Sequence, residues 1–398
     1  MKAIFTLEIR NNRLYVFGEI PYLADDKSAQ IVLGKNANVT KMSINGNCNY
    51  MVNISPDNDY FRIYSIDEVH EDGNIYIEYD SCVEGENNIL CDEIVSLSLY
   101  SNTFPSQLPD YIEGSICYFK EGFENYDIIY SYMDENRGLL AKDTSKYFGE
   151  IVNIVGFKKS DLKSFEIDNI KVYYRNEQSY ENLYECAELG VEAFSYYNQI
   201  YSHKETRMDL IVLGVGSSGA YNRGNLIVSG IAPKDFCMPK HIPEGFPLTE
   251  EEYRVWLKYS TFTHELGHVW FCHANTASYE DWLNETGAEW SSLLFLLHKG
   301  EIDLFHKFYS IREHEHKLSR EPIKPKDLHR PNAVHGSGVV LFYKIYEKYG
   351  IETVLKILQI LSQMNKQCTD GLLEKIRIEL SVEVADFIQN RLESYIEL

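Results

Sequence analysis

The chain has 398 residues, and its 60 Asp and Glu residues outnumber its 38 Lys and Arg residues, which gives a formal net charge of −22. With 44% hydrophobic and 25% charged residues, the composition excludes a disordered chain, a collagen-like chain and a coiled-coil rod. The acidic balance argues against a nucleic-acid partner and against an anionic membrane surface, because both require a basic face.

The first part of the chain, residues 1–165, is predicted to form an antiparallel β domain. Hydrophobic and polar residues alternate in short segments at residues 4–9, 14–20, 75–79, 95–100 and 151–155. Turn-forming pairs such as Asn45-Gly46 and Asp72-Gly73 fall between such segments. The start of the chain lacks a long apolar core, so it is typical of a first strand rather than of a signal peptide.

The second part, residues 166–398, is predicted to be mostly helical, which makes the whole chain an α+β protein of two domains. A strand at 171–174, a helix at 179–201 and strands at 210–215 and 226–228 are followed by a proline-rich stretch at 233–247 that should contain no helix. Thr249 and Glu252 form a capping box that begins a helix. Apolar residues at helical spacing predict further helices at 339–346, 354–361 and 384–392.

The location predicted for this chain is the cytoplasm. Its eight cysteines are scattered without a paired spacing, which favours reduced thiols over a disulfide framework. No stretch reaches the roughly 18 apolar residues that a membrane-spanning helix needs, so no membrane segment is expected.

One motif carries chemistry, His264-Glu265-Leu266-Gly267-His268. Histidines four apart on a helix are separated by about 40° around the axis and about 6 Å along it, so both imidazoles can reach one metal ion. Glu265 projects to the side of that ion, where its carboxylate can take a proton from a bound water. A structural zinc site is the alternative, but it needs four protein ligands, and no fourth ligand is evident nearby in the sequence.

A third ligand is expected from a carboxylate on the next helix. Glu285, separated from His268 by sixteen residues, is our candidate, and Glu280, Asp281 and Glu289 are its competitors. Glu289 lies one turn beyond Glu285 on the same helix face, where it can accept the other N–H of a ligand histidine and fix its tautomer. The alternative for Glu280, Asp281 and Glu289 is solvated surface charge.

The segment HELGHVWF at 264–271, followed by WLNE at 282–285, resembles the zinc core of the aminopeptidase N-like gluzincins, a family that includes leukotriene hydrolase. The resemblance implies a β-rich domain followed by a thermolysin-like catalytic domain. It also implies one Zn²⁺ per chain bound by His264, His268 and Glu285, with Glu265 as the general base. Gly219-Ala220-Tyr221-Asn222 stands about where the family has its substrate-strand motif, which implies that Gly219, Ala220 and Asn222 bind substrate.

Three departures from the family pattern bear on specificity and architecture. The spacer between His268 and Glu285 is two residues shorter than the family norm. Asn222 stands where the family has the glutamate that holds the free amino terminus of the substrate. The family's long C-terminal helical domain is also expected to be absent.

A further departure concerns the transition state. The family has a catalytic tyrosine in a Tyr-x-x-Gly setting, and the corresponding segment here is His335-Gly336-Ser337-Gly338, ahead of the helix predicted at 339–346. The resemblance therefore implies that an N–H of His335 stabilises the oxyanion. An ordinary loop histidine is the alternative, and Tyr343 and Tyr346 are the fallback donors.

The sequence thus predicts a zinc metallopeptidase that hydrolyses peptide bonds in a peptide or protein substrate. It is aminopeptidase-like, with altered recognition of the amino terminus. An endopeptidase or a protease dedicated to a precursor peptide is the alternative within the same chemistry. A non-catalytic zinc-binding scaffold is the alternative from another class, and the intact Glu265 argues against it, because a scaffold needs no general base.

Overall fold

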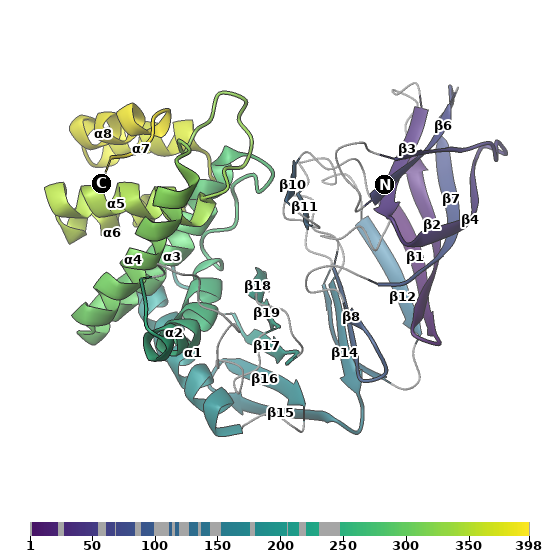
Figure 1. Ribbon diagram of the computed structural model, residues 1–398, viewed down its shortest axis with the longest axis horizontal. Helices are drawn as coiled ribbons and strands as arrows, with labels where there is room; N and C mark the ends of the chain where they lie inside the picture. Colours follow the sequence, from purple (N-terminus) through teal and green to yellow (C-terminus); the bar gives the residue numbers. More distant parts are fainter. Residues whose placement is uncertain are drawn as a thin grey trace. The chain divides into compact units, whose positions relative to one another are not determined.

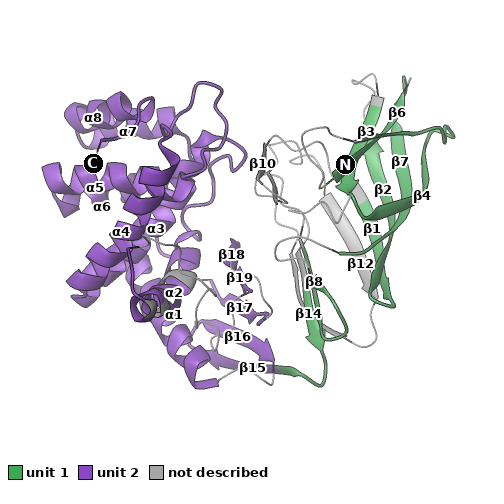
Figure 2. Cartoon of the chain, viewed as in Figure 1, with its two compact units in different colours: residues 1–162 green, residues 163–398 purple. Residues whose placement is uncertain are grey.

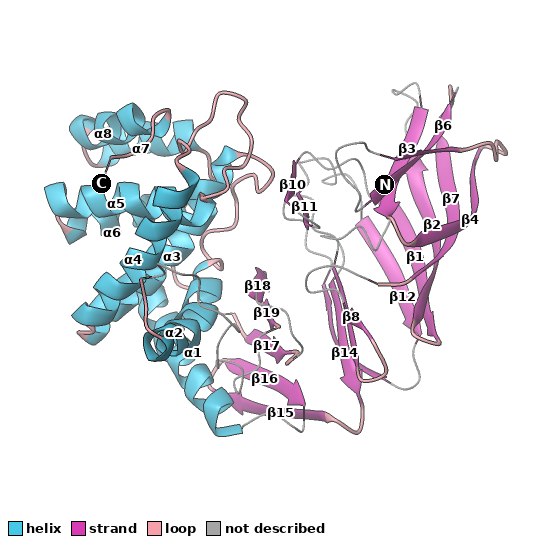
Figure 3. Cartoon of the chain, viewed as in Figure 1, coloured by secondary structure: helices cyan, strands magenta, loops and turns pink. Residues whose placement is uncertain are grey.

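The computed structural model describes residues 2–22, 28–54, 61–67, 69–83, 89–98, 111–113, 116–118, 127–133, 137–143, 153–175, 180–204, 206–214, 220–230 and 247–397. The chain divides into two compact units, Met1–Leu162 and Lys163–Leu398 (Figure 2). The described residues of the first unit form strands, and the second unit combines a sheet with helices (Figure 3). The domain boundary expected at residue 165 falls within a strand of the second unit's sheet, β15 (Leu162–Ile167).

The first unit is built from several sheets (Figure 1). The largest has the order β12-β1-β2-β7-β4, and the others have the orders β13-β14-β9-β8, β3-β6-β5 and β10-β11. The strands are β1 (Lys2–Arg10), β2 (Arg13–Tyr22), β3 (Ser28–Gly34), β4 (Ala37–Ile44), β5 (Met51–Ile54), β6 (Phe61–Asp67), β7 (Gly73–Ser81), β8 (Ile89–Leu90), β9 (Ile94–Ser98), β10 (Tyr111–Glu113), β11 (Ile116–Tyr118), β12 (Asp127–Met133), β13 (Arg137–Asp143) and β14 (Asn153–Lys158).

Alternation along the strands places one face of the largest sheet in a core. On β2, Leu14 and Val16 are buried while Tyr15 and Phe17 are exposed, because successive side chains of a strand point to opposite faces. One expectation is wrong: the domain is not entirely antiparallel, because β1 pairs with β12 in parallel. These two strands are far apart in sequence, and a long connection permits either direction, which local alternation cannot reveal.

The sheet of the second unit has the order β15-β16-β17-β19-β18. β16 (Ile170–Arg175), β17 (Met208–Val212) and β19 (Leu226–Ser229) run parallel, and β18 (Ala220–Arg223) lies at one end of the sheet, antiparallel to β19. The parallel strands are rich in Val, Ile and Leu, and all four residues of β19 are buried, as expected of strands inside a parallel sheet.

The helices of the second unit enclose its core. Buried side chains from the sheet and from the helices form one hydrophobic cluster, which includes Trp270, Trp282 and Trp290. The helices are α1 (Tyr180–Ile200), α2 (Glu250–Gly267), α3 (Trp282–Lys299), α4 (Ile302–Ser319), α5 (Val334–Tyr349), α6 (Ile351–Ser362), α7 (Thr369–Glu379) and α8 (Val382–Leu392), with a 3₁₀ turn at Tyr279–Asp281. Within the described ranges, every helix is too short or too polar to traverse a bilayer.

Most elements predicted from periodicity are present. The strands predicted at 4–9, 14–20, 75–79, 171–174 and 226–228 are confirmed, as are the helices at 354–361 and 384–392. The strand predicted at 210–215 ends at Val212, and residue 215 lies outside the described residues. Residues 99–100, 151–152, 179 and most of the proline-rich stretch also lie outside the described residues. The capping box that begins α2 is confirmed.

Glycines let four helices of the second unit approach one another closely. A Cβ at Gly267 of α2 would lie 2.8 Å from the backbone of Ala288 on α3. A Cβ at Gly338 of α5 would lie 1.9 Å from Oγ1 of Thr286 on α3, and one at Gly336 would lie 2.7 Å from the carbonyl oxygen of Arg312 on α4. These positions have no room for a side chain, so the glycines fix the spacing of α2, α3, α4 and α5.

We expect Gly338→Ala to destabilise the second unit by about 1–3 kcal/mol, because the added methyl group overpacks the contact between α5 and α3. Thr286→Ala should recover part of that loss, since it removes the hydroxyl that the methyl group meets. Denaturant unfolding of both single variants and the double variant measures the coupling. Additive effects would contradict the direct contact.

Candidate metal centre

The two histidines of the sequence motif lie at the end of α2. His264 is in its last turn, and His268 is the C-cap residue, which keeps right-handed helical angles. Their imidazole rings are nearly perpendicular, and their Nε2 atoms lie 3.1 Å apart. The spacing of the histidines therefore brings both rings to one point.

The tautomer of His268 is set by the backbone. Its Nδ1 lies 2.9 Å from the carbonyl oxygen of Phe271, which can only accept, so Nδ1 carries the proton and donates. The lone pair of the neutral ring is then on Nε2, directed at His264. Nδ1 of His264 lies 3.1 Å from Oε1 of Glu289, as in an ion pair, but without the geometry of a hydrogen bond. The 3.1 Å contact of the two Nε2 atoms can be held by a proton on His264 or by a cation between the two nitrogens.

Glu285 adds a carboxylate oxygen to the two nitrogens. It is in the first turn of α3, and its Oε2 lies 3.5 Å from Nε2 of His264 and 3.7 Å from Nε2 of His268. Ligand atoms about 2.0–2.1 Å from a tetrahedral zinc ion lie about 3.4 Å from one another. The three mutual distances, from 3.1 to 3.7 Å, fit such an ion, and Oε2 of Glu285 is a buried acceptor without a hydrogen-bond donor.

The charge around these atoms also favours a cation. Burial lowers the pKa of His264, but the carboxylates of Glu289 and Glu285 outweigh burial and raise its pKa well above the usual value. Burial raises the pKa of Glu285, but His335 and His268 hold it well below the usual range, so the carboxylate is ionised. The donor set thus combines two imidazoles and a carboxylate in a buried site that attracts positive charge.

Glu265 is on α2, next to His264 in sequence and rotated about 100° around the helix axis from it. Its side chain is buried, with 7% of the residue exposed, and its charge contributes to the raised pKa of His264. The structure therefore places a third buried carboxylate near His264.

Glu289 and an arginine that the sequence did not single out form a buried pair behind His264. Nη2 of Arg312, on α4, donates to Oε1 of Glu289, and Nη1 donates to both oxygens of Glu315 at 2.9 Å. Burial raises the pKa of Glu289, but Arg312 and His264 outweigh it and lower its pKa to about 2. Arg312 gave no local signal, because only the packing of α4 against α3 and α5 brings it here.

Surface charge is the wrong interpretation of the acidic residues around Glu285. Asp281 and Glu289 are only 2% and 5% exposed. Asp281 accepts from Nε of Arg330 at 2.8 Å and from Nδ2 of Asn284 at 2.8 Å. Glu280 accepts from the backbone and the hydroxyl of Thr369. Asp281 and Glu280 thus hold the start of α3, and neither side chain takes the place of Glu285.

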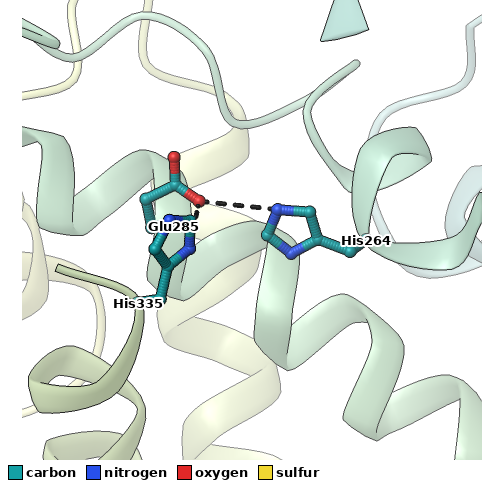
Figure 4. Close-up of side chains that lie close together, drawn as sticks. All are labelled: His264, Glu285 and His335. Carbon is teal, nitrogen blue, oxygen red and sulfur yellow. Dashed lines mark ion pairs between the residues drawn. The ribbon is translucent and has the colours of Figure 1, made fainter. Parts of the chain in front are cut away.

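His335 is not in a loop, because α5 begins at Val334 and includes the whole His335–Gly338 segment. Its Nδ1 lies 2.9 Å from Oε2 of Glu285, and Figure 4 shows dashed lines that join Glu285 to both His264 and His335. The glycines at 336 and 338 serve helix packing, because an added Cβ would meet α4 and α3 there. The fallback tyrosines are elsewhere: Tyr343 stacks on Tyr309 and Tyr346 packs against Trp290.

The segment expected to align a substrate forms an edge strand. Ala220 and Asn222 are on β18, which pairs only with β19 among the described strands and packs against α2. Asn222 is buried, with 8% of the residue exposed. Gly219 lies outside the described residues.

No family model matches the chain, and no curated protein is similar to it in sequence. Solved structures match it in fold. A mutant M1 zinc metallopeptidase from Deinococcus radiodurans, bound to a Tyr-Ser-Ala substrate, matches with a TM-score of 0.58 and 12% identity, over 100% of this chain and 95% of that one. Native leukotriene A4 hydrolase from Saccharomyces cerevisiae matches with a TM-score of 0.61 and 12% identity, over 100% of this chain and 68% of that one.

Proposed function

We propose, from the fold shared with M1 zinc metallopeptidases and leukotriene A4 hydrolase, that this chain is a zinc-dependent peptidase. The observation that carries the proposal is the convergence of His264, His268 and Glu285, whose donor atoms lie 3.1 to 3.7 Å apart. The parallel sheet beside the motif helix further supports a thermolysin-like catalytic unit.

His264, His268 and Glu285 would hold one Zn²⁺. When bound, the ion polarises the scissile carbonyl and lowers the pKa of water to about 7. The protein's own residues prepare the ligands: Phe271 fixes the tautomer of His268, and Glu289 orients His264. Such outer contacts typically change metal affinity or activity by about 10–100-fold when they are removed.

Glu265 is the proposed general base. A carboxylate beside the histidine pair can take a proton from the attacking water and later return it to the leaving amine. Its burial excludes bulk water from that transfer. His335 is the proposed donor to the oxyanion, because its ring adjoins Glu285 and an imidazole N–H can replace a hydroxyl in that role.

The edge strand β18 is the proposed substrate strand. An extended peptide can pair with the backbone of an edge strand, and β18 packs against the helix that carries Glu265. Peptide substrates are also supported by the Tyr-Ser-Ala ligand of the Deinococcus radiodurans enzyme. Ala220 and Asn222 would contribute to this surface, together with Gly219. A cytoplasmic location is part of the proposal, which the scattered cysteines of the sequence support.

Altered recognition of the substrate amine follows from Asn222. A neutral amide cannot form the charged pair with an ammonium group that a carboxylate forms, and such a charge-assisted bond is worth about 1.5–3 kcal/mol. An endopeptidase, or a protease dedicated to one precursor peptide, is therefore the second candidate. Both candidates use the same zinc chemistry.

A peptide library with free and N-acetylated versions of each sequence tests the proposal. We expect cleavage that a chelator abolishes and Zn²⁺ restores, with free and blocked versions cleaved at rates within about tenfold of each other. Asn222→Glu should shift the preference toward free amines, and the unchanged protein is its matched control. Full zinc loading without any cleavage would contradict the peptidase proposal and favour a scaffold, whereas strict rejection of blocked peptides would contradict the altered recognition alone.

A further inference from the structure

The contact between His335 and Glu285 bears on the fourth position of the metal centre. Three protein ligands leave one tetrahedral corner open, whereas a fourth protein ligand closes it. Ligand atoms of His264, Glu285 and His335 all lie within 4.8 Å of one another, in a group that does not include His268. His335 therefore stands beside two of the three proposed ligands.

The orientation of the two side chains differs from that of a hydrogen-bonded pair. Nδ1 of His335 and Oε2 of Glu285 are 2.9 Å apart, as in an ion pair, but both atoms are buried and their geometry does not meet that of a hydrogen bond. Two ligands of one cation have the same arrangement. A bound ion would satisfy both atoms at once.

The backbone holds the His335 ring in this place. Gly336 abuts the carbonyl oxygen of Arg312 on α4, and Gly338 abuts Thr286 on α3, one residue after Glu285. Since neither position has room for a side chain, the start of α5 packs closely against α4 at Gly336 and against α3, the helix that carries Glu285, at Gly338. The neutral imidazole also differs chemically from a phenol, because one of its nitrogens carries a lone pair suited to zinc.

We propose that Nδ1 of His335 is a fourth ligand in the substrate-free protein and that a substrate must displace this ring to reach the centre. The resting site would then contain three imidazoles and one carboxylate. Once displaced, the ring lies beside the reacting carbonyl, where its N–H can serve the oxyanion. The displacement of the ring by a substrate rests on the proposed peptidase function. The ligand set of the substrate-free protein can be measured without any substrate.

X-ray absorption at the zinc edge of the substrate-free, zinc-loaded protein counts the imidazoles directly. We expect three imidazoles in the unchanged protein and two in His335→Ala and His335→Gln, with zinc affinity reduced at least about tenfold in competition with a chromophoric chelator. His298→Ala is the matched control, because His298 is an exposed residue at the far end of the helix that carries Glu285. It should change neither measurement.

His335→Gln separates ligation from oxyanion donation, because an amide donates an N–H but is a poor zinc ligand. If His335 is a displaceable ligand, His335→Gln should lower KM and keep kcat within about tenfold of that of the unchanged protein, whereas His335→Ala should lower kcat. Two imidazoles in the unchanged protein, with affinities unaffected in both variants, would overturn the ligand proposal and leave the peptidase proposal standing. Three imidazoles without any peptide cleavage would support the ligand proposal and overturn the peptidase.

Discussion

Glu265→Gln is expected to lower the rate of peptide hydrolysis by about 10²- to 10⁴-fold while zinc content stays at the level of the unchanged protein. The amide has the size and shape of the carboxylate but cannot accept a proton at neutral pH. Because His264, His268 and Glu285 are untouched, the ligand geometry should survive. Single-turnover cleavage rates, measured together with zinc content on the same sample, check both parts.

Glu251→Gln is the matched control for this experiment. Glu251 is on the same helix, exposed and in its first turn, so its substitution should change neither rate nor zinc content. If Glu265→Gln hydrolyses peptides as fast as the control, Glu265 is not the general base. If it loses zinc as well, the carboxylate has a structural part in the site, and the loss of activity then carries no information about proton transfer.

Arg312→Met is expected to destabilise the second unit by about 3–5 kcal/mol, because it leaves the charge of Glu289 buried without its partner. Arg312 and Glu289 are 8% and 5% exposed, so water cannot replace the guanidinium. Denaturant unfolding of the zinc-free protein measures this cost separately from metal binding. Tryptophan fluorescence reports on the second unit alone, because it contains every tryptophan of the chain, namely Trp256, Trp270, Trp282 and Trp290.

The double variant Arg312→Met with Glu289→Gln distinguishes a buried charge from simple loss of packing. Removing both charges should recover most of the lost stability, since replacing both partners of a buried pair is far less costly than breaking it. The glutamine oxygen can still accept from His264, so zinc affinity should recover in part. Equal stability of the double and single variants would show that the charge of Glu289 is not the cause.

The chemical core of the site could be predicted because its signals are local or nearly so. His264, Glu265 and His268 are within one helical turn, and the capping box at Thr249 fixes where that helix begins. Glu285 follows on the next long helix, so its approach to the histidine pair depends on the one connection between α2 and α3, residues 268–281. Amphipathic spacing likewise sufficed for α6 and α8, which present one apolar face each.

Features that depend on distant pairings could not be predicted from the sequence. The parallel pairing of β1 with β12 and the contact of Arg312 with Glu289 join residues from separate elements, for which periodicity carries no signal. The His335–Gly338 segment looked like a loop because glycine disfavours helices, by about 1 kcal/mol relative to alanine. Tertiary packing decides otherwise, since two of those residues occupy contacts where only glycine fits.

The close contacts of α2, α3 and α5 give the candidate centre a mechanical role. A cation held there would cross-link three helices that are otherwise joined through apolar packing and a few hydrogen bonds. Free energy of ion binding would then appear as resistance of the whole helical unit to unfolding. The atoms proposed for chemistry would thereby also govern how long the folded enzyme lasts, so a cell short of zinc would lose protein as well as activity.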